Sequence, residues 1–375
     1  MPEFIEDHGT SRLFILSPKA IKCPEAMIER SELSVEGRTL HLSNLGKMMY
    51  PEAAFTKSHM IDYYIRISSA LLPHLKDRPI TLKRYPDGVT GEYFYEKRAP
   101  SHTPDWVQTT LVERSSGKPD IMAVLINDLP TLIWSANLAN LELHTPLSRA
   151  PHLHQPTMVV FDLDPGPPAN VIDCARVALW LRDLLGTMKL PCFAKTSGSK
   201  GMQLYVPLNT PVTFEQTRAF SKAVGEALRR EHRESIVVEM AKHLRTGKVF
   251  IDYSQNASRK TTVCVYSLRA AHSTPFVSTP VTWEELERAI KKNKPELLYF
   301  EAKEVLKRVE KNGDLFAPLL TLKHKLPSGF VEGPATRQGT DLSAYNAKRD
   351  FTRTREPDSG AGAVRKEEAG QLFVI

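Results

Sequence analysis

Three aspartates lie on segments that the sequence predicts to be β-strands. Asp162 and Asp164 are two residues apart in TMVVFDLDPGPP, so a strand would place both carboxylates on one face. Two carboxylates this close repel each other, and the arrangement is stable mainly when a cation lies between them. Asp252 occurs in KVFIDYSQN, inside an apolar strand pattern where an unpaired charge would be costly. Singly, each acid fits an ordinary strand end or a paired structural aspartate; together they match a two-metal phosphoryl-transfer site.

A Ser/Gly-rich segment, KTSGSKGMQLYVPL, lies between these acids. Ser197 and Lys200 offer a hydroxyl and an ammonium, and the glycines allow close backbone approach, a combination suited to a triphosphate. The segment is not a Walker A loop, because Lys200 precedes the second glycine and a strand follows instead of a helix. A plain hairpin turn is the alternative interpretation.

Basic and aromatic residues interleave in TLKRYPDGVTGEYFYEKRAP. This pattern suits a surface that binds phosphates and stacks on bases. Tyr93 and Tyr95 are also at strand spacing, so they could pack inward instead. The residues concerned are Lys83, Arg84, Tyr85, Tyr93, Phe94, Tyr95, Lys97 and Arg98.

The composition is that of a globular chain with a moderate basic excess. The 375 residues carry a formal net charge of +7, which is compatible with a polyanionic partner but does not establish one. There is no apolar run of the roughly 18 residues that a membrane span requires, and the acidic N-terminal residues argue against a secretion signal. The four cysteines form no C-x-x-C pair, so neither a disulfide framework nor a structural zinc is supported. We expect a cytoplasmic protein without membrane contact.

Periodicity and turn residues predict the elements that position these groups. Helices are expected at 57–75, 169–188, 213–232 and 282–292, and from Pro295 to a left-handed cap at Asn312-Gly313. Strands are expected at 157–164, 193–195, 204–207, 248–253 and 261–267. After about residue 326 the sequence has too few apolar residues to repay the entropy of ordering, which predicts a linker.

Seven segments in order resemble the polymerase domain of bacterial ligase D, a member of the archaeo-eukaryotic primase superfamily. They are LKRYPDG, WSANLANLELHTP, FDLDPGP, KTSGSKG, FIDYSQN, TTVCVYSLRA and VSTPVTWEEL, and the resemblance covers roughly residues 40 to 325. It implies an α+β fold: a primase-type catalytic core with mixed and antiparallel β-sheets flanked by helices. The implied organisation is an N-terminal extension (1–38), a primase-polymerase domain (39–326) and a linker (327–375) leading toward a 3′-phosphoesterase domain.

The resemblance implies a metal-dependent nucleotidyltransferase that fills gaps and extends 3′ ends at double-strand breaks in non-homologous end joining. Its implied cofactor is Mn²⁺ or Mg²⁺, and its substrates are NTPs, which the family favours, or dNTPs. The implied partners are gapped or broken DNA with a 5′-phosphate, Ku and the ligase module of the same pathway, which would associate the protein with the nucleoid. The alternatives are a non-catalytic DNA-end-binding scaffold and a metal-dependent nuclease. The Ser/Gly segment favours the polymerase, because a nuclease has no triphosphate to bind.

The resemblance, carried over position by position to this sequence, implies roles for individual residues. Asp162, Asp164 and Asp252 are the expected metal ligands and catalytic residues, Lys47 and Lys57 would hold the downstream 5′-phosphate, and Phe94 and Tyr95 would stack on the template. The expected nucleotide-binding residues are Lys83, His144, Ser197, Lys200, Gln203, Arg245, Gln255 and Arg269. Gln203 departs from the family, which has histidine there. Its amide can donate a hydrogen bond but can never be cationic.

Overall fold

The computed structural model describes residues 30–114 and 117–331. The chain divides into two units, Met1–Lys325 and Leu326–Ile375, and only residues 326–331 of the second are described, including helix α8 (Ser328–Val331). Most of the predicted N-terminal extension and linker therefore lies outside the described residues. These two assignments, and the phosphoesterase domain expected beyond them, stay predictions.

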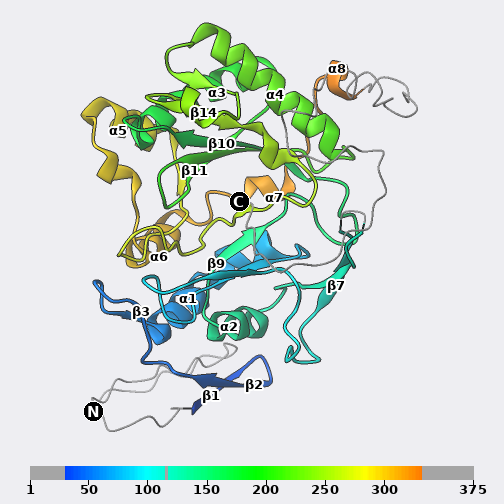
Figure 1. Cartoon of the computed structure of the whole chain (residues 1–375), viewed down its shortest axis with the longest axis vertical. Coiled ribbons are helices and arrows are strands. Elements are labelled where there is room, and N and C mark those ends of the chain that lie inside the picture. The colour runs from blue at the N-terminus through cyan, green and yellow to red at the C-terminus, as the bar shows by residue number, and fades with distance from the viewer. Residues whose placement is uncertain (1–29, 115–116, 332–375) are drawn as a thin grey trace, which may run out of the picture. The chain divides into compact units, whose positions relative to one another are not determined.

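A six-stranded sheet forms the upper half of the larger unit in Figure 1. Its strands, in spatial order, are β13 (Ile236–Val237), β14 (Val249–Asp252), β10 (Met158–Pro165), β12 (Met202–Pro207), β11 (Phe193–Thr196) and β16 (Pro280–Val281). Only β13 and β14 pair in parallel. Helices α3 (Val171–Thr187) and α4 (Phe214–Glu231) pack against β10. This cover explains why the β10 segment MVVF is fully buried and apolar without alternation.

A four-stranded antiparallel sheet lies in the lower half of the same unit. Its order is β15 (Thr262–Val263), β9 (Asn140–Thr145), β5 (Thr81–Arg84) and β6 (Phe94–Glu96). Helix α2 (Leu129–Asn137) contacts β9, and α1 (Lys57–Leu75) packs against α2 (Figure 1). Helix α1 buries an apolar stripe, whereas α2 is buried all round, in contact with α1, β2 and β9, and the two helices cover one face of the sheet.

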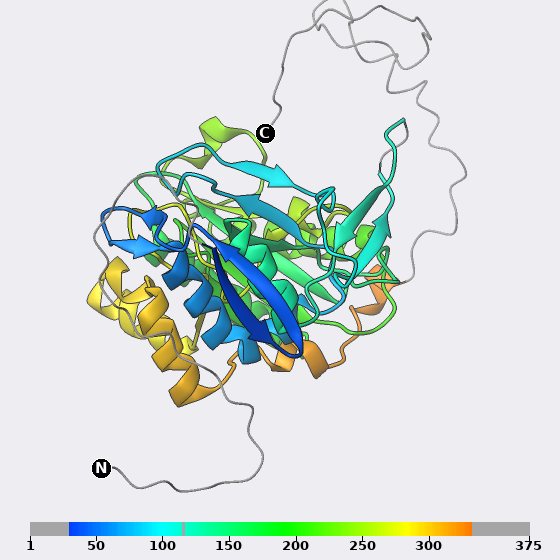
Figure 2. The ribbon, with the colours of Figure 1, turned by 90° about the horizontal axis from the view of Figure 1, so that it is seen from below.

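Three two-stranded hairpins complete the β-structure of the described residues. They are β1 (Arg30–Val35) with β2 (Arg38–Ser43), β3 (Met48–Tyr50) with β4 (Phe55–Thr56), and β7 (Thr109–Val112) with β8 (Ile121–Val124). The β1–β2 hairpin lies across α2 (Figure 2), where Arg38 pairs with Asp128, the N-cap of that helix. The domain boundary predicted after residue 38 thus falls within β2.

The structure confirms the mixed α+β prediction and most of the predicted helices. The capping boxes at Thr213/Gln216 and Thr282/Glu285 form, opening α4 and α5 (Trp283–Lys292). Because the capping side chains bond only within three residues of themselves, such helix starts are readable from local sequence. Among the described residues, no helix is both long and apolar enough to cross a membrane.

The helix predicted to run from Pro295 to Asn312 is wrong in its continuity. A 3₁₀ turn, η3 (Pro295–Leu298), is followed by extended backbone, and α6 (Ala302–Asn312) begins after it. The break occurs because Phe300 and Glu301 pair with the 276–277 segment, a tertiary contact that local periodicity does not report. The helix ends at Asn312-Gly313 as predicted, and Gly313 has a positive φ of +66°, although its ψ of −164° departs from that of a regular left-handed cap. A short helix, α7 (Pro318–Thr321), follows.

The strand predicted at 261–267 is shorter than expected. β15 ends at Val263, and the chain then turns, with the Ser267 N–H donating to the Cys264 carbonyl. The Leu143 N–H donates to the Ser267 hydroxyl at 2.9 Å, which fixes this turn against β9. The turn brings Arg269 to the four-stranded sheet.

Candidate active site

A row of polar side chains crosses the six-stranded sheet from β11 to β14. Lys195 lies opposite Gln203, Gln203 opposite Asp162, and Asp162 opposite Asp252. Residues directly opposite each other on neighbouring strands project from the same face of a sheet. We call these four residues, together with Asp164 on β10, the acidic row. Asp164 lies two residues beyond Asp162 on the same strand, so the sheet brings the three predicted metal ligands together.

Asp162 and Asp164 are held in an environment that opposes their charge. Burial, followed by repulsion from Asp164, raises the pKa of Asp162 to about 8. Burial and then Asp252 raise the pKa of Asp164. Within the described residues, the side chains do not form a ready-made cluster of three His, Cys, Asp or Glu ligands. Lys195 and Arg245 act against these upward shifts, but burial and the neighbouring carboxylates outweigh them.

Two glutamines donate hydrogen bonds to these carboxylates. Gln203 Nε2 donates to Asp162 Oδ1 at 3.0 Å, and Gln203 Oε1 accepts from Lys195 Nζ at 2.7 Å and from the Tyr205 hydroxyl at 3.0 Å. Gln255 Nε2 lies 3.3 Å from Asp252 Oδ2. Gln203 is buried, and its amide orients Asp162. Its predicted contact with a triphosphate stays a prediction.

Arg245 lies beside the C-terminal end of β10. It ends the 3₁₀ turn η1 (Lys242–Arg245), and its guanidinium lies 3.6 Å from the centre of the Phe250 ring, which is opposite Asp164. Its charge opposes the upward shift of the Asp164 pKa. A Cβ on Gly166 would lie 1.9 Å from the Arg245 carbonyl oxygen, so only glycine lets the turn after β10 approach this segment.

A second polar row crosses the four-stranded sheet. Tyr95 on β6 lies opposite Lys83 on β5, and Lys83 lies opposite Glu142 on β9. His144 is two residues beyond Glu142 and shares its face. We call Lys83, Glu142 and His144, together with Arg269, the basic cluster. Three of its members were predicted to bind nucleotide, and the structure brings them together around Glu142.

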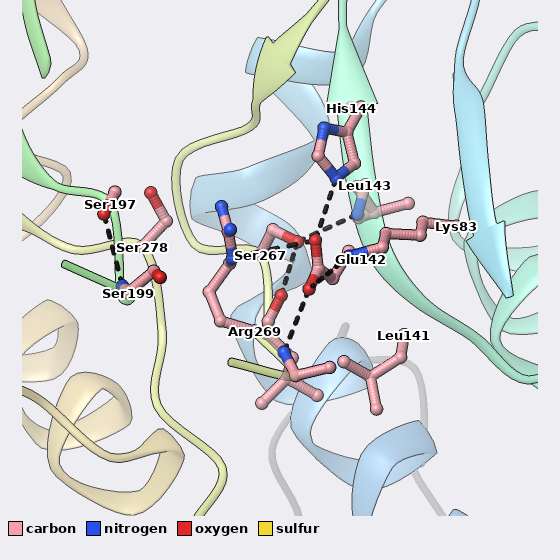
Figure 3. Close-up of polar contacts among 12 residues, drawn as sticks. Lys83, Leu141, Glu142, Leu143, His144, Ser197, Ser199, Ser267, Arg269 and Ser278 are labelled. Carbon is pink, nitrogen blue, oxygen red and sulfur yellow. Dashed lines mark hydrogen bonds and ion pairs between the residues drawn. The ribbon is translucent and has the colours of Figure 1, made fainter. Parts of the chain in front are cut away.

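Glu142 is the residue that sequence reasoning missed. Its side chain is 1% exposed, and its carboxylate lies 3.4 Å from Lys83 Nζ, 2.9 Å from His144 Nε2 and 3.6 Å from Arg269 Nε (Figure 3). It also accepts the Ala270 N–H at 3.0 Å. The segment NLELHT alternates polar and apolar residues, which is also the pattern of a strand with one solvent-facing side, so nothing in the sequence indicates that Glu142 is buried.

The charges of the basic cluster stabilise one another. Burial acts to raise the pKa of Glu142, but Arg269, His144 and Lys83 outweigh it and hold that pKa well below its usual range. Burial lowers the pKa of Lys83 and of His144, and Glu142 opposes both shifts. The Lys83 ammonium also lies 4.3 Å from the centre of the Tyr93 ring, within cation–π distance.

Arg269 lies between the basic cluster and the Ser/Gly loop (Figure 3). Gly198 has φ +66°, and a Cβ there would lie 2.7 Å from Arg269 Cγ, so glycine is what allows this loop to pack on the arginine. Ser197 Oγ accepts the N–H groups of Ser199 and Gly201, each at 3.2 Å, which orders the loop. Burial lowers the pKa values of Lys83 in one sheet and Lys195 in the other, and Arg269 lowers both further, so its charge reaches both rows. Lys200 is exposed on the loop.

Lys47 and Lys57 lie together although ten residues separate them. The Lys57 N–H donates to the Lys47 carbonyl at 2.8 Å. The Lys47 ammonium donates to the Pro86 carbonyl, and the Lys57 ammonium to the Ser43 carbonyl, each at 2.7 Å. Burial, followed by repulsion from Lys47, lowers the pKa of Lys57 to about 8. The Lys47 ammonium also lies 3.4 Å from the exposed Asp87 carboxylate, whereas Lys57 has no carboxylate partner within the described residues. Two neighbouring cations with one exposed acid beside Lys47 can receive an anion.

Phe94 and Tyr95 are exposed on β6, at 43% and 54%. Successive side chains of a strand point to opposite faces, so the pair does not form one continuous stacking surface. Tyr95 lies edge-on to His144, with ring centres 5.9 Å apart, whereas Phe94 lies against Arg84. Only Tyr95 is part of the face that carries the basic cluster.

Comparison with known families matches residues 56–316 to the LigD primase-polymerase domain. The chain belongs to the LigD primase-polymerase family. It is similar to the polymerase domain from Mycobacterium tuberculosis ligase D in complex with DNA, with a TM-score of 0.69 and 37% identity, covering 75% of this chain and 98% of that one. The predicted family, fold and nucleotidyltransferase class are confirmed.

Full-length LigD proteins also match. The multifunctional non-homologous end joining protein LigD of Mycolicibacterium smegmatis is 36% identical over 320 residues, which cover 85% of this chain and 39% of that protein. The bifunctional non-homologous end joining protein LigD of Bacillus subtilis is 31% identical over 315 residues, or 81% of this chain and 49% of that protein. The chain thus spans less than half the length of these LigD relatives.

Proposed function

We propose that this LigD-family chain is a metal-dependent repair polymerase that adds nucleotides to 3′ ends at gaps and double-strand breaks in non-homologous end joining. The observation that carries the proposal is the acidic row. Asp162 and Asp252 lie opposite each other, Asp164 is on the same face, and burial and mutual repulsion raise the pKa values of Asp162 and Asp164. Such a site favours a bound cation, because a cation removes the repulsion.

The donor set fits Mn²⁺ or Mg²⁺, since both are hard cations that prefer carboxylate oxygen. Asp162, Asp164 and Asp252 would hold the metal. A bound metal would favour ionisation of the primer 3′-hydroxyl and offset the charge of the pyrophosphate leaving group. Gln203 and Gln255 hold the flanking carboxylates by hydrogen bonds and so limit their rotation.

The basic cluster and the Ser/Gly loop are the proposed nucleotide site. Lys83, His144 and Arg269 would face the phosphates, together with Ser197 and Lys200. Arg269 links this site to the acidic row, because its charge reaches Lys195, which is hydrogen-bonded to Gln203. Gln255 and Arg245 would contact the nucleotide next to Asp252 and Asp164.

The DNA contacts proposed are Lys47 and Lys57 for a downstream 5′-phosphate, and Phe94 and Tyr95 for the template. The M. tuberculosis relative is a complex with DNA, which supports DNA as the partner. We extend the proposal to a preference for ribonucleotides, to Ku and the ligase module as pathway partners, and to a nucleoid-associated location.

Primer extension on a gapped duplex with a downstream 5′-phosphate tests the function. The reactions compare Mn²⁺ with Mg²⁺ and ribonucleotides with deoxyribonucleotides, with a chelator as the blank. Metal-dependent extension is expected. DNA binding without extension would replace the proposal with an end-binding scaffold, and a shortened primer would replace it with a nuclease.

A further inference from the structure

Glu142 accepts contacts from more groups than a buried carboxylate needs. Its two oxygens take the Ala270 N–H, the Lys83 ammonium and the Tyr85 hydroxyl on one side, and His144 with Arg269 on the other. A carboxylate with one guanidinium partner would already be neutralised. Here one buried carboxylate contacts two cationic side chains, Lys83 and Arg269, and one histidine, His144.

The backbone fixes both Glu142 and its partners. Glu142 is in the middle of β9, which pairs with β5 on one side and with β15 on the other. Arg269 is held by its own N–H, which donates to the Phe276 carbonyl, and by its carbonyl, which accepts the Tyr50 hydroxyl at 2.8 Å. The cluster therefore has a defined geometry before any ligand arrives.

We propose that Glu142 is a positioning residue of the nucleotide site: its carboxylate holds Lys83, His144 and Arg269 in the arrangement that receives the nucleotide phosphates. This inference rests on the proposed function, because it takes those three side chains as phosphate-binding groups. Glu142 itself touches no substrate in this scheme and acts through its partners.

Lys83 is the partner that depends most on Glu142. Its side chain is 12% exposed, and burial lowers its pKa while Glu142 opposes that shift. Removing the negative charge leaves a desolvated ammonium beside Arg269, and such an ammonium loses its proton more easily. A neutral amine binds phosphate more weakly than an ammonium, because the charge-assisted hydrogen bond is lost.

The other groups around Lys83 do not obscure this effect. The titratable and charged groups that face it are Glu142 and His144 on β9, Arg269 after β15, Tyr95 on β6, and Tyr85 and Tyr93 between β5 and β6. Burial raises the pKa values of Tyr85 and Tyr95, and it lowers that of His144. Glu142 opposes the downward pKa shifts of both Lys83 and His144, so removing its charge acts on the two groups in the same direction.

Glu142→Gln keeps the size and one acceptor oxygen but removes the charge. The measurement is the binding of a fluorescent ATP analogue with Mn²⁺ at pH 6.5 and pH 8.5, to wild type and variant in parallel. We expect the variant to bind about tenfold more weakly than wild type at pH 8.5, the loss of one charge-assisted hydrogen bond, and to recover most of this at pH 6.5. Protonation of the nucleotide cancels in the ratio to wild type.

Two further variants separate positioning from stability. Glu285→Gln is the matched control, because Glu285 on α5 is a largely buried carboxylate that pairs with Arg308 on α6, outside the site. It should lower the melting temperature without changing nucleotide affinity at either pH. Glu142→Asp keeps the charge and should retain the wild-type pH profile, so it tests the proposal if Glu142→Gln does not fold.

The outcomes distinguish failure of the proposed function from failure of the proposed role of Glu142. If wild type binds no nucleotide, the proposed function fails, whatever Glu142 does. If wild type binds and folded Glu142→Gln binds equally well at both pH values, Glu142 is not a positioning residue. A loss in Glu142→Gln that is the same at both pH values would also overturn the proposal, because it would show that the negative charge of Glu142 does not act on Lys83.

Discussion

The acidic row and the basic cluster are built in the same way and carry opposite charge. Each is built around side chains directly opposite one another on neighbouring antiparallel strands. In the acidic row, Asp162 faces Asp252, and the pKa of Asp162 rises to about 8 with burial and the charge of Asp164. In the basic cluster, Lys83 faces Glu142, and the cations outweigh burial and lower the Glu142 pKa.

This difference shows what each sheet is missing. Like charges on opposite residues destabilise a sheet, whereas opposite charges stabilise it. The six-stranded sheet needs a cation, while the four-stranded sheet and its Arg269 have positive charge to spare. A metal–nucleotide complex supplies both signs at once. The comparison therefore explains why one ligand complex would engage both sheets.

Breaking the acidic row should have the largest effect. Asn at position 162, 164 or 252 removes a metal-binding charge, and extension should fall by more than about 100-fold, since even the outer partners of metal ligands cost 10–100-fold. Affinity for gapped DNA, measured by fluorescence anisotropy, should be unchanged because these acids do not attract phosphate. Asp183→Asn, on an exposed part of α3 beside Arg182, is the control and should extend normally. Near-normal extension by one of the three variants would remove that residue from the site.

The second test asks whether Lys47 and Lys57, which lie outside the basic cluster, bind a ligand of their own. Lys47→Ala with Lys57→Ala should erase the preference for 5′-phosphorylated over 5′-hydroxyl gaps, a loss of about 10–100-fold for two charge-assisted hydrogen bonds. In wild type the preference should weaken as the pH rises through about 8, because Lys57 has its pKa lowered to that value and is neutral above it.

Competition between 5′-phosphate and 5′-hydroxyl duplexes measures this preference. Lys291→Ala with Lys292→Ala, both exposed at the end of α5, is the matched loss of two positive charges and should leave the preference intact. A preference that survives in the double variant places the phosphate pocket elsewhere.

The third test sharpens the assignment of the basic cluster's face. Tyr95→Ala should weaken binding to single-stranded template overhangs by roughly tenfold, within the range of about 1–3 kcal/mol per stacked base, and Tyr95→Phe should not. Phe94→Ala tests whether the other face of β6 also contacts the template, because Phe94 lies on that face. Leu111→Ala, at an exposed apolar position of β7, is the control. Equal affinity for Tyr95→Ala and wild type would exclude Tyr95 from stacking.

The smallest effect concerns stability and has opposite signs in the two regions. Without metal, Asp162→Asn should raise the melting temperature at pH 8.5 by about 2–4 °C, equivalent to roughly 1 kcal/mol, whereas Glu142→Gln should lower it. The folded-state pKa of Asp162 is raised, so its ionisation destabilises the fold increasingly as the pH rises toward about 8. The gain should therefore shrink at pH 5. Scanning calorimetry in a chelator measures both, and a destabilised Asp162→Asn would contradict the charge-repulsion account.

The sequence alone determined the features that depend on near neighbours. The helix at 57–75, the capping boxes at Thr213 and Thr282, and the strands bearing Asp162 and Asp252 follow from periodicity and side chains that bond within a few residues. The seven motifs, in their order along the chain, also indicated the family and located the candidate site residues. None of these required knowledge of how the chain folds back on itself.

The tertiary structure alone decided which of these residues meet. The register that sets Asp162 against Asp252, and Lys83 against Glu142, joins residues 90 and 59 positions apart in the sequence. The same long-range pairing broke the helix expected after Pro295 by drawing Phe300 and Glu301 to the 276–277 segment. Glu142 was overlooked because a buried acid reveals its role only through its partners. Those partners lie on β5, on its own strand and in the Arg269 turn, and strand register, not local propensity, brings them together.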